Sequence, residues 1–253
     1  MSTGNLHSSE ILKKALFNLP QGMPVSASHL KEFGISRQLA YRYVQSGWLK
    51  QLGYGYYLRM GDTLTETGAV ASLQANGVNV HIGGKSALAL KGFSHYLSMG
   101  GERLTLFGHG TRKLPEWFQN QFNVTLSNSL LFEEQNALEE RLSVARLDNE
   151  AYAPFVAEPE RAVLELLDLV PKQQTLGEAR QIMEALQSLR SKKVQELLKA
   201  CKKIKVKRLF WKIAQELNLP VVKKINPSEI DFGSKSVYIL QREKNLALRN
   251  PNG

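Results

Sequence analysis

Side chains suited to contacting DNA bases and phosphates cluster in one short stretch near the start of the chain. They are Ser36, Arg37, Gln38, Tyr41 and Arg42. Arginine and glutamine can form paired hydrogen bonds with the edges of guanine and adenine. Apart from Ser36 they point away from the apolar stripe of a helix, so packing alone does not require them. The stretch therefore predicts a recognition helix that enters the major groove by its first turns.

Two further helical patterns would position this helix. The first begins near Ser8 and ends by Pro20. The second runs from Ser26, a suitable N-cap, to Gly34, a suitable stop. Ser36 is then the expected N-cap of the recognition helix. Two helices joined by a turn that contains glycine form the helix-turn-helix arrangement.

The residues after the predicted recognition helix favour a β-hairpin, because two β-prone runs flank a glycine-bearing tip. We expect Trp48 and Leu49 to be buried and to seat this wing on the helices. Lys50 and Tyr54 would reach phosphates or the minor groove. Residues 1–60 are thus predicted to form a winged helix-turn-helix DNA-binding domain. The alternative is a protein-interaction module of the same fold, since a fold does not fix a function.

Charge is sorted along the chain. Residues 1–60 carry +5, residues 61–189 carry −6 and residues 190–253 carry +11, which together give the net charge of +10. Such a surplus favours polyanionic partners, meaning nucleic acid or an anionic membrane surface. The sequence predicts two basic ends around an acidic middle.

Composition narrows the class of protein. The 253 residues, 43% of them hydrophobic, suffice for one to three packed domains. A single cysteine, Cys201, excludes an internal disulfide framework and a cysteine-rich zinc site. We find no secretory signal pattern and no apolar stretch long enough to cross a membrane. We therefore expect a cytoplasmic protein with no membrane partner.

One segment of the middle region invites an enzymatic interpretation. Gly84-Lys85-Ser86 resembles the end of a phosphate-binding loop, but that pattern needs a glycine at position 79, which is asparagine. A strand over 78–82 and a helix over 86–91 explain the segment better. The histidines of the region have no ligand partners at suitable spacing, so we expect structural roles for them. These histidines are His81, His95 and His109. No nucleophile–base or metal constellation can be named, so we expect no enzyme and no cofactor.

The remaining patterns predict a larger C-terminal domain over residues 61–253. Alternating segments at 103–107, 122–126 and 142–147 indicate strands of a small mixed sheet. Helices are expected to start at Glu158-Pro159, with Pro171 ending the pattern, and to cover 176–189. The predicted fold class is α+β, a winged helix-turn-helix followed by a mixed α/β domain with a basic helical C-terminal part. A terminal strand over 236–240 completes it.

The basic part is concentrated in residues 190–224, which hold twelve Lys and Arg against two Glu. Its apolar spacing predicts two amphipathic helices joined near residues 204–207. Their cations would form a basic ridge that contacts nucleic acid, either DNA or an RNA. The alternative is that the ridge contacts a protein partner. The ridge residues are Lys202, Lys203, Lys205, Lys207, Arg208 and Lys212.

Taken together, the segments resemble the AbiEi family, antitoxins of type IV toxin–antitoxin systems and related transcriptional regulators. The resemblance covers nearly the whole chain. It rests on SGWLKQLGYGYYL, HIGGKSALALKGFSHYL, EPERAVLELLDLVP, and LLKACKKIKVKRLFWKIAQEL followed by IDFGSK. The first segment is common to winged helices, and the other three in this order are more specific. The tail after Ile239 departs from the family, where a glycine-rich hairpin often follows.

The resemblance implies a winged helix that represses its own operon at repeated operator sites in double-stranded DNA. It also implies a C-terminal domain needed to counter a nucleotidyltransferase-like toxin, without a stable complex. The alternatives are a stand-alone winged-helix regulator and a protein-interaction scaffold without antitoxin activity.

Overall fold

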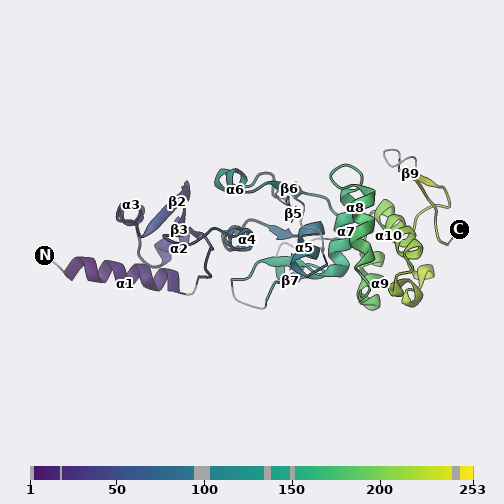
Figure 1. The fold of residues 1–253 in the computed structure, drawn as a ribbon, viewed down its shortest axis with the longest axis horizontal. Coiled ribbons are helices and arrows are strands. Elements are labelled where there is room, and N and C mark those ends of the chain that lie inside the picture. The colour runs from purple at the N-terminus through teal and green to yellow at the C-terminus, as the bar shows by residue number, and fades with distance from the viewer. Residues whose placement is uncertain are drawn as a thin grey trace. The chain divides into compact units, whose positions relative to one another are not determined.

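A computed structural model describes residues 3–17, 19–93, 103–133, 138–148, 152–240 and 246–252, with side chains except those of residues 3–9 and 139. The chain forms two compact units. The first contains residues 1–80, 111–123 and 146–155, and the second contains 81–110, 124–145 and 156–253. Figure 1 labels their elements along the chain. The first unit thus extends beyond the predicted domain 1–60.

The first unit begins with three helices and a small antiparallel sheet, in strand order β1-β3-β2. The elements are α1 (Thr3–Phe17), β1 (Val25–Ser26), α2 (Ala27–Glu32), α3 (Arg37–Gln45), β2 (Leu49–Gly53) and β3 (Tyr56–Arg59). This is the predicted winged helix-turn-helix. The first helix starts five residues earlier than its apolar pattern predicted, because residues 3–7 are also helical.

Local sequence signals set the helix-turn-helix as predicted. The Ser26 hydroxyl accepts a hydrogen bond from the His29 amide at 3.1 Å, and the Ser36 hydroxyl accepts one from the Leu39 amide at 3.2 Å. Gly34, in the turn between them, has a φ of +77°, a conformation that other residues adopt only with strain. An apolar core that includes Leu30 closes the module.

Two further helices belong to the first unit. They are α4 (Glu66–Ala75), whose N-cap is Thr65, and α6 (Glu116–Gln121). In α4, residues 68–73 are all buried, so this helix is a core element of its unit.

The second unit contains a five-stranded sheet in strand order β6-β5-β4-β8-β7, with parallel pairing in β5–β6 and β4–β8. Its strands are β4 (Val80–Ile82), β5 (Leu104–Gly108), β6 (Val124–Ser127), β7 (Val144–Arg146) and β8 (Phe155–Ala157). Four of the five fall within or beside the segments predicted as strands, and β8 was not predicted. Helix α5 (Gly84–Leu90) follows β4 two residues earlier than predicted.

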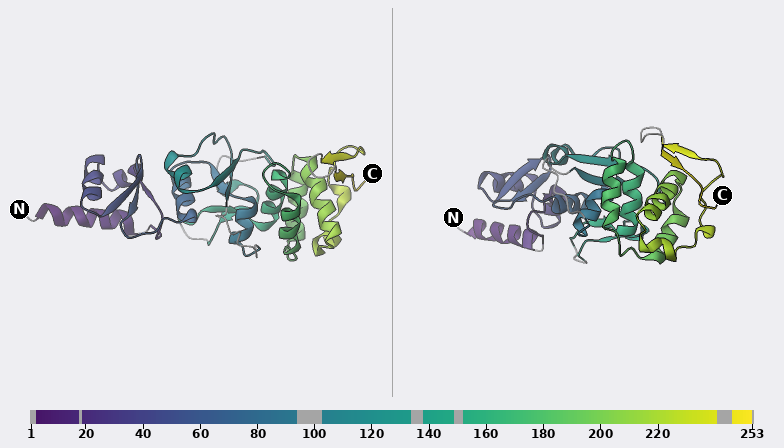
Figure 2. Two further views of the ribbon diagram at one scale, coloured as in Figure 1. Left: turned by 45° about the horizontal axis from the view of Figure 1, so that its top comes forward. Right: turned by 45° about the vertical axis from the view of Figure 1, so that its right-hand side comes forward.

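Helices cover the rest of the second unit, and Figure 2 shows α7 and α10 side by side in both views. They are α7 (Pro159–Leu169), α8 (Leu176–Glu184), α9 (Ser191–Ala200) and α10 (Ile204–Glu216), with short 3-10 turns at Leu138–Glu140, Pro220–Lys224 and Pro227–Glu229. The joint between α9 and α10 lies at 201–203, slightly before its predicted place. The tail forms a hairpin of β9 (Tyr238–Leu240) and β10 (Leu246–Leu248), although its sequence departs from the glycine-rich pattern.

Candidate nucleic-acid interface

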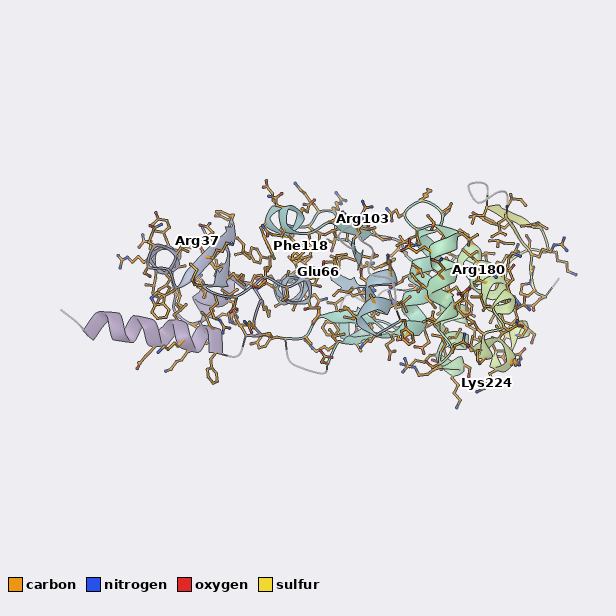
Figure 3. All side chains as sticks on the ribbon, in the orientation of Figure 1. Arg37, Glu66, Arg103, Phe118, Arg180 and Lys224 are labelled. Carbon is orange, nitrogen blue, oxygen red and sulfur yellow. The ribbon has the colours of Figure 1, made fainter. Side chains whose placement is uncertain are left out.

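The outer face of α3 carries the predicted contact side chains. Ser36, Arg37, Gln38, Tyr41 and Arg42 are all exposed. The opposite face is anchored by Ala40 and Tyr43, which are buried in the core of the winged helix. Figure 3 shows Arg37 at the surface of the winged helix. A rigid helix therefore presents an uninterrupted polar face.

The wing tip lies next to the start of α3. Tyr54 is 83% exposed, and Gly55 beside it has a φ of +73° that lets the hairpin turn. Arg37 donates a hydrogen bond from Nη1 to the Tyr54 hydroxyl at 3.3 Å. Its guanidinium also lies 5.7 Å from the centre of the Tyr54 ring. The structure thus brings together two predicted contact residues that are 17 positions apart.

Lys50 lies on β2, opposite Leu58 of β3, and its side chain is exposed. No described residue forms an ion pair with Lys50, Arg37 or Arg42. Exposed cations with no carboxylate partner are available to phosphates. The recognition helix and the wing thus each present exposed cations.

The prediction that Trp48 is buried is wrong. Its side chain is 49% exposed, whereas Leu49 is fully buried as expected. Trp48 lies just before β2, which begins at Leu49, and Leu49 is the residue that packs in the core of the winged helix.

The prediction of an exposed basic ridge over residues 202–212 is also wrong for Lys207 and Arg208. Lys207 and Arg208 are each only 3% exposed. Arg208 donates hydrogen bonds to four backbone carbonyls of the tail, those of Phe232, Ser234, Ser236 and Leu248. Lys207 donates one to the carbonyl of Asp231 at 2.9 Å. These two cations hold the C-terminal segment on α10, so they cannot contact a phosphate in this fold.

Lys203 and Lys205 bind the C-terminal end of α7. The Lys203 ammonium lies 2.8 and 2.9 Å from the two carboxylate oxygens of Asp168, and the Lys205 ammonium lies 2.8 Å from the carbonyls of Asp168 and Val170. Lysines suit this place because the carbonyls at a helix C-terminus carry partial negative charge. Ser129 completes the cluster with hydrogen bonds to Asp168 and Lys203.

The sequence did not predict the cluster of Ser129, Asp168 and Lys203, because its members are far apart in the chain. Chemically it is an ion pair with a bound hydroxyl. Lys203 donates to both oxygens of the Asp168 carboxylate and to the Ser129 hydroxyl, so its hydrogen bonds are used within the cluster. We assign it to the packing of α7 against α10.

The last two ridge residues are more accessible. Lys202 pairs with Glu133, and Lys212 pairs with Glu216 at 2.7 Å. Ion pairs this exposed stabilise little, so they can exchange for other partners. DNA contact by Lys202 and Lys212 stays a prediction.

A buried charge network links β4 to α7 in the second unit. The Glu165 carboxylate accepts hydrogen bonds from His81 Nε2 at 2.8 Å, Arg161 Nε at 2.7 Å and the Gly84 amide at 3.1 Å. Arg141 donates to His81 Nδ1 at 2.9 Å. Because arginine can only donate, Nδ1 is the acceptor, so His81 is neutral with its proton on Nε2.

Burial and neighbouring charges set the titration of this network. Burial lowers the pKa of His81 below its ordinary value, against the opposing effect of Glu165. The pKa of Glu165 is also lowered: burial raises it, but His81 and Arg161 outweigh that effect. Gly83 is required here because a Cβ at this position would overlap the Glu165 carboxylate. His81 thus has a structural role, as predicted.

The structure also shows the surroundings of Lys85 and His109 in the middle region. Lys85 pairs with Glu178 at 2.5 Å instead of facing an open loop. His109 is described and has a buried Nδ1 without a hydrogen-bond partner, while His95 lies outside the described residues. Within the described part of the chain, no group of three potential metal ligands occurs. A search of the same residues finds no helix long and apolar enough to span a bilayer.

The capped helix-turn-helix and the basic wing define a winged-helix regulator with a larger mixed α/β domain. Comparison of the sequence with protein families gives two matches. Residues 8–99 match the N-terminal domain of AbiEi antitoxin transcriptional regulators, and residues 101–247 match the transcriptional regulator, AbiEi antitoxin of type IV toxin–antitoxin systems. The chain belongs to this family.

Among solved structures, the chain is similar to that of the RV2827C protein from Mycobacterium tuberculosis. The TM-score is 0.55 over 95% of this chain and 91% of that one, at 13% sequence identity. A likeness at this identity concerns the fold alone. No curated protein matches the sequence.

Proposed function

We propose that this protein represses its own operon by binding repeated operator sites through α3 and the wing. The observation that carries the proposal is the exposed polar face of α3 joined to the wing by the Arg37–Tyr54 contact. Arg37 and Gln38, on the first turn, would read base edges, while Tyr41 and Arg42 continue the face along the groove. Lys50 and Tyr54 would bind phosphates or the adjacent minor groove. Such a protein works in the cytoplasm, where the operator is.

We further propose that the protein is an antitoxin that counters a nucleotidyltransferase-like toxin without a stable complex. Membership of a family of type IV antitoxins supports this role. On this proposal the protein acts by binding and performs no catalysis.

The DNA-binding part is tested with the full-length protein and a duplex that carries the region upstream of its own gene. Arg37→Ala or Gln38→Ala should cost on the order of 1–3 kcal/mol and relax base preference at one position. Lys50→Ala should weaken binding to all sequences about equally. Lys224→Ala serves as the control, since this exposed lysine projects from the second unit (Figure 3). Unchanged affinity of Arg37→Ala and Gln38→Ala would contradict the proposal.

The antitoxin part is tested separately by co-expression with the protein encoded in the neighbouring reading frame. We expect growth arrest by that protein alone and rescue by this chain. Rescue should persist in Arg37→Ala, because that change affects operator binding only. Absence of rescue by the unmodified chain would remove the antitoxin role and leave the regulator.

A further inference from the structure

Residues 111–123 lie between strands β5 and β6 in the sequence, yet they belong to the compact unit of the winged helix. Their helix, α6, contacts strand β2 of the wing. Phe118 of α6 is fully buried, and its ring contacts that of Trp117 with centres 5.5 Å apart (Figure 3). This segment is therefore a built part of the first unit.

The contact with the wing is close and specific. A Cβ at Gly53 would lie 2.6 Å from the Cβ of Trp117, so the approach requires glycine at this position. The ring of Trp117 also packs against that of Tyr56, with centres 4.9 Å apart. Gly53 and Tyr56 are paired across the hairpin and flank the tip that carries Tyr54. Helix α6 thus fixes the wing at its tip.

The face of the wing that α6 covers is the face that carries Lys50. Lys50 is paired with Leu58, and Leu58 and Tyr56 are two residues apart, so all three side chains point to the same side. Leu49 and Tyr57 point to the other side, into the core of α1, α2 and α3. A duplex that contacts Lys50 therefore approaches the side of the wing on which α6 lies.

The segment carries exposed cations of its own. Arg112 and Lys113 are both exposed, and neither forms an ion pair with any residue that the structure describes. One exposed acid, Glu116, follows them at the start of α6. The exposed amide of Asn120 adds a neutral hydrogen-bonding group, while the Gln119 amide donates within the segment to the Leu114 carbonyl at 2.7 Å. Unpaired cations next to a DNA-contacting wing are suited to phosphates that flank the bound groove.

We propose that residues 111–123 complete the DNA-binding module. Trp117 positions the wing, and Arg112 and Lys113 bind backbone phosphates beside it. This inference rests on the proposed DNA-binding function, and it extends the contact surface beyond the winged helix to a segment inserted between two strands of the sheet.

The test uses the full-length protein, the duplex from upstream of its gene and a titration with salt. Each phosphate contact adds roughly 0.9 to the slope of log K against log salt. The double variant Arg112→Ala/Lys113→Ala should lower that slope by roughly 1.8 without changing base preference. Lys223→Ala/Lys224→Ala, which removes the same charge from exposed positions of the second unit, should leave the slope unchanged.

Three outcomes separate the two proposals. An unchanged slope in Arg112→Ala/Lys113→Ala, with Arg37→Ala still losing affinity, overturns the inference and retains the proposed function. Equal falls in the salt slope for Arg112→Ala/Lys113→Ala and for Lys223→Ala/Lys224→Ala also overturn the inference, because the effect then reflects total charge. Failure of the unmodified protein to bind overturns both.

The positioning role of Trp117 has its own readout. Trp117→Leu should weaken binding and reduce the additional effect of Lys50→Ala, since a displaced wing no longer presents Lys50. Gly53→Ala, which pushes the wing away from Trp117 without removing an aromatic ring, should act in the same direction. The melting curve of the Gly53→Ala protein shows whether it is folded. If it is folded and Lys50→Ala still weakens its DNA binding to the full extent, the positioning role is contradicted.

Discussion

The cations of the winged helix and those of residues 202–212 have opposite surroundings, although both runs are strongly basic in sequence. Arg37, Arg42 and Lys50 are exposed and have no ion-pair partner among the described residues. Lys207 and Arg208 are buried among backbone carbonyls, and Lys203 is bound to Asp168. A run of positive charge therefore indicates a nucleic-acid surface only where the fold leaves it unpaired.

The two regions differ in which backbone groups need hydrogen bonds from side chains. Serine hydroxyls cap the N-terminal ends of α2 and α3, so the charged side chains of these helices are not needed there. The tail after α10 contains little regular structure, and buried carbonyls outside helices and sheets need donors. Arg208 supplies several donors from one side chain. The charge density of the second region is thus used for internal hydrogen bonds.

The largest expected effect tests the buried network of the second unit. Glu165→Gln leaves His81, Arg161 and the Gly84 amide without their carboxylate, which should lower the free energy of unfolding by about 3–5 kcal/mol. Glu178→Gln is the matched control. Its side chain is 40% exposed in its pair with Lys85, so the loss should stay below about 1 kcal/mol. Urea denaturation measures both, and equal losses would show that burial does not distinguish the two carboxylates.

A pH titration sharpens the same contrast. Because burial lowers the pKa of His81 from 6.5, the unfolded chain binds this proton more readily than the native protein does. The contribution of neutral His81 to the free energy of unfolding is therefore complete above pH 6.5. It is lost as pH falls towards the native pKa, by at most about 1.4 kcal/mol per pH unit. The free energy of unfolding should fall between about pH 6.5 and pH 5, and less so in His81→Gln. Identical curves for the two proteins would contradict the assignment.

The wing provides a smaller effect. Trp48→Ala should lower the free energy of unfolding by less than about 1 kcal/mol, because the exposed indole leaves little cavity when removed. The neighbouring Leu49→Ala should cost about 2–5 kcal/mol by opening a cavity in the core. Thermal melts of the two variants measure the difference. A large loss in Trp48→Ala would place the indole in the core after all.

The smallest expected effect concerns the accessible remainder of the ridge. If Lys202 and Lys212 contact the DNA backbone as predicted, the double variant Lys202→Ala/Lys212→Ala should lower the salt slope of operator binding by at most roughly 1.8, since both lysines must first leave carboxylate partners within the protein. An unchanged slope would remove both lysines from the DNA interface. The same binding assay as for Arg112 and Lys113 provides the comparison.

The sequence alone determined the local elements of the winged helix. Ser26 and Ser36 supply caps, Gly34 supplies the turn conformation and the Leu39/Tyr43 stripe fixes which face of α3 is exposed. Each of these signals acts over a few residues, so it can be read without the fold. The recognition face and the family follow from such signals.

Only the tertiary structure decided how distant charges are used. That Asp168 binds Lys203, that Arg208 holds the tail and that Glu165 meets His81 depend on contacts between elements far apart in the sequence. The placement of α6 against Gly53 is of the same kind, since no local pattern indicates that residues 111–123 return to the wing. Exposure and pairing are properties of the packed chain, which is why a basic sequence could predict the amount of positive charge and not its location.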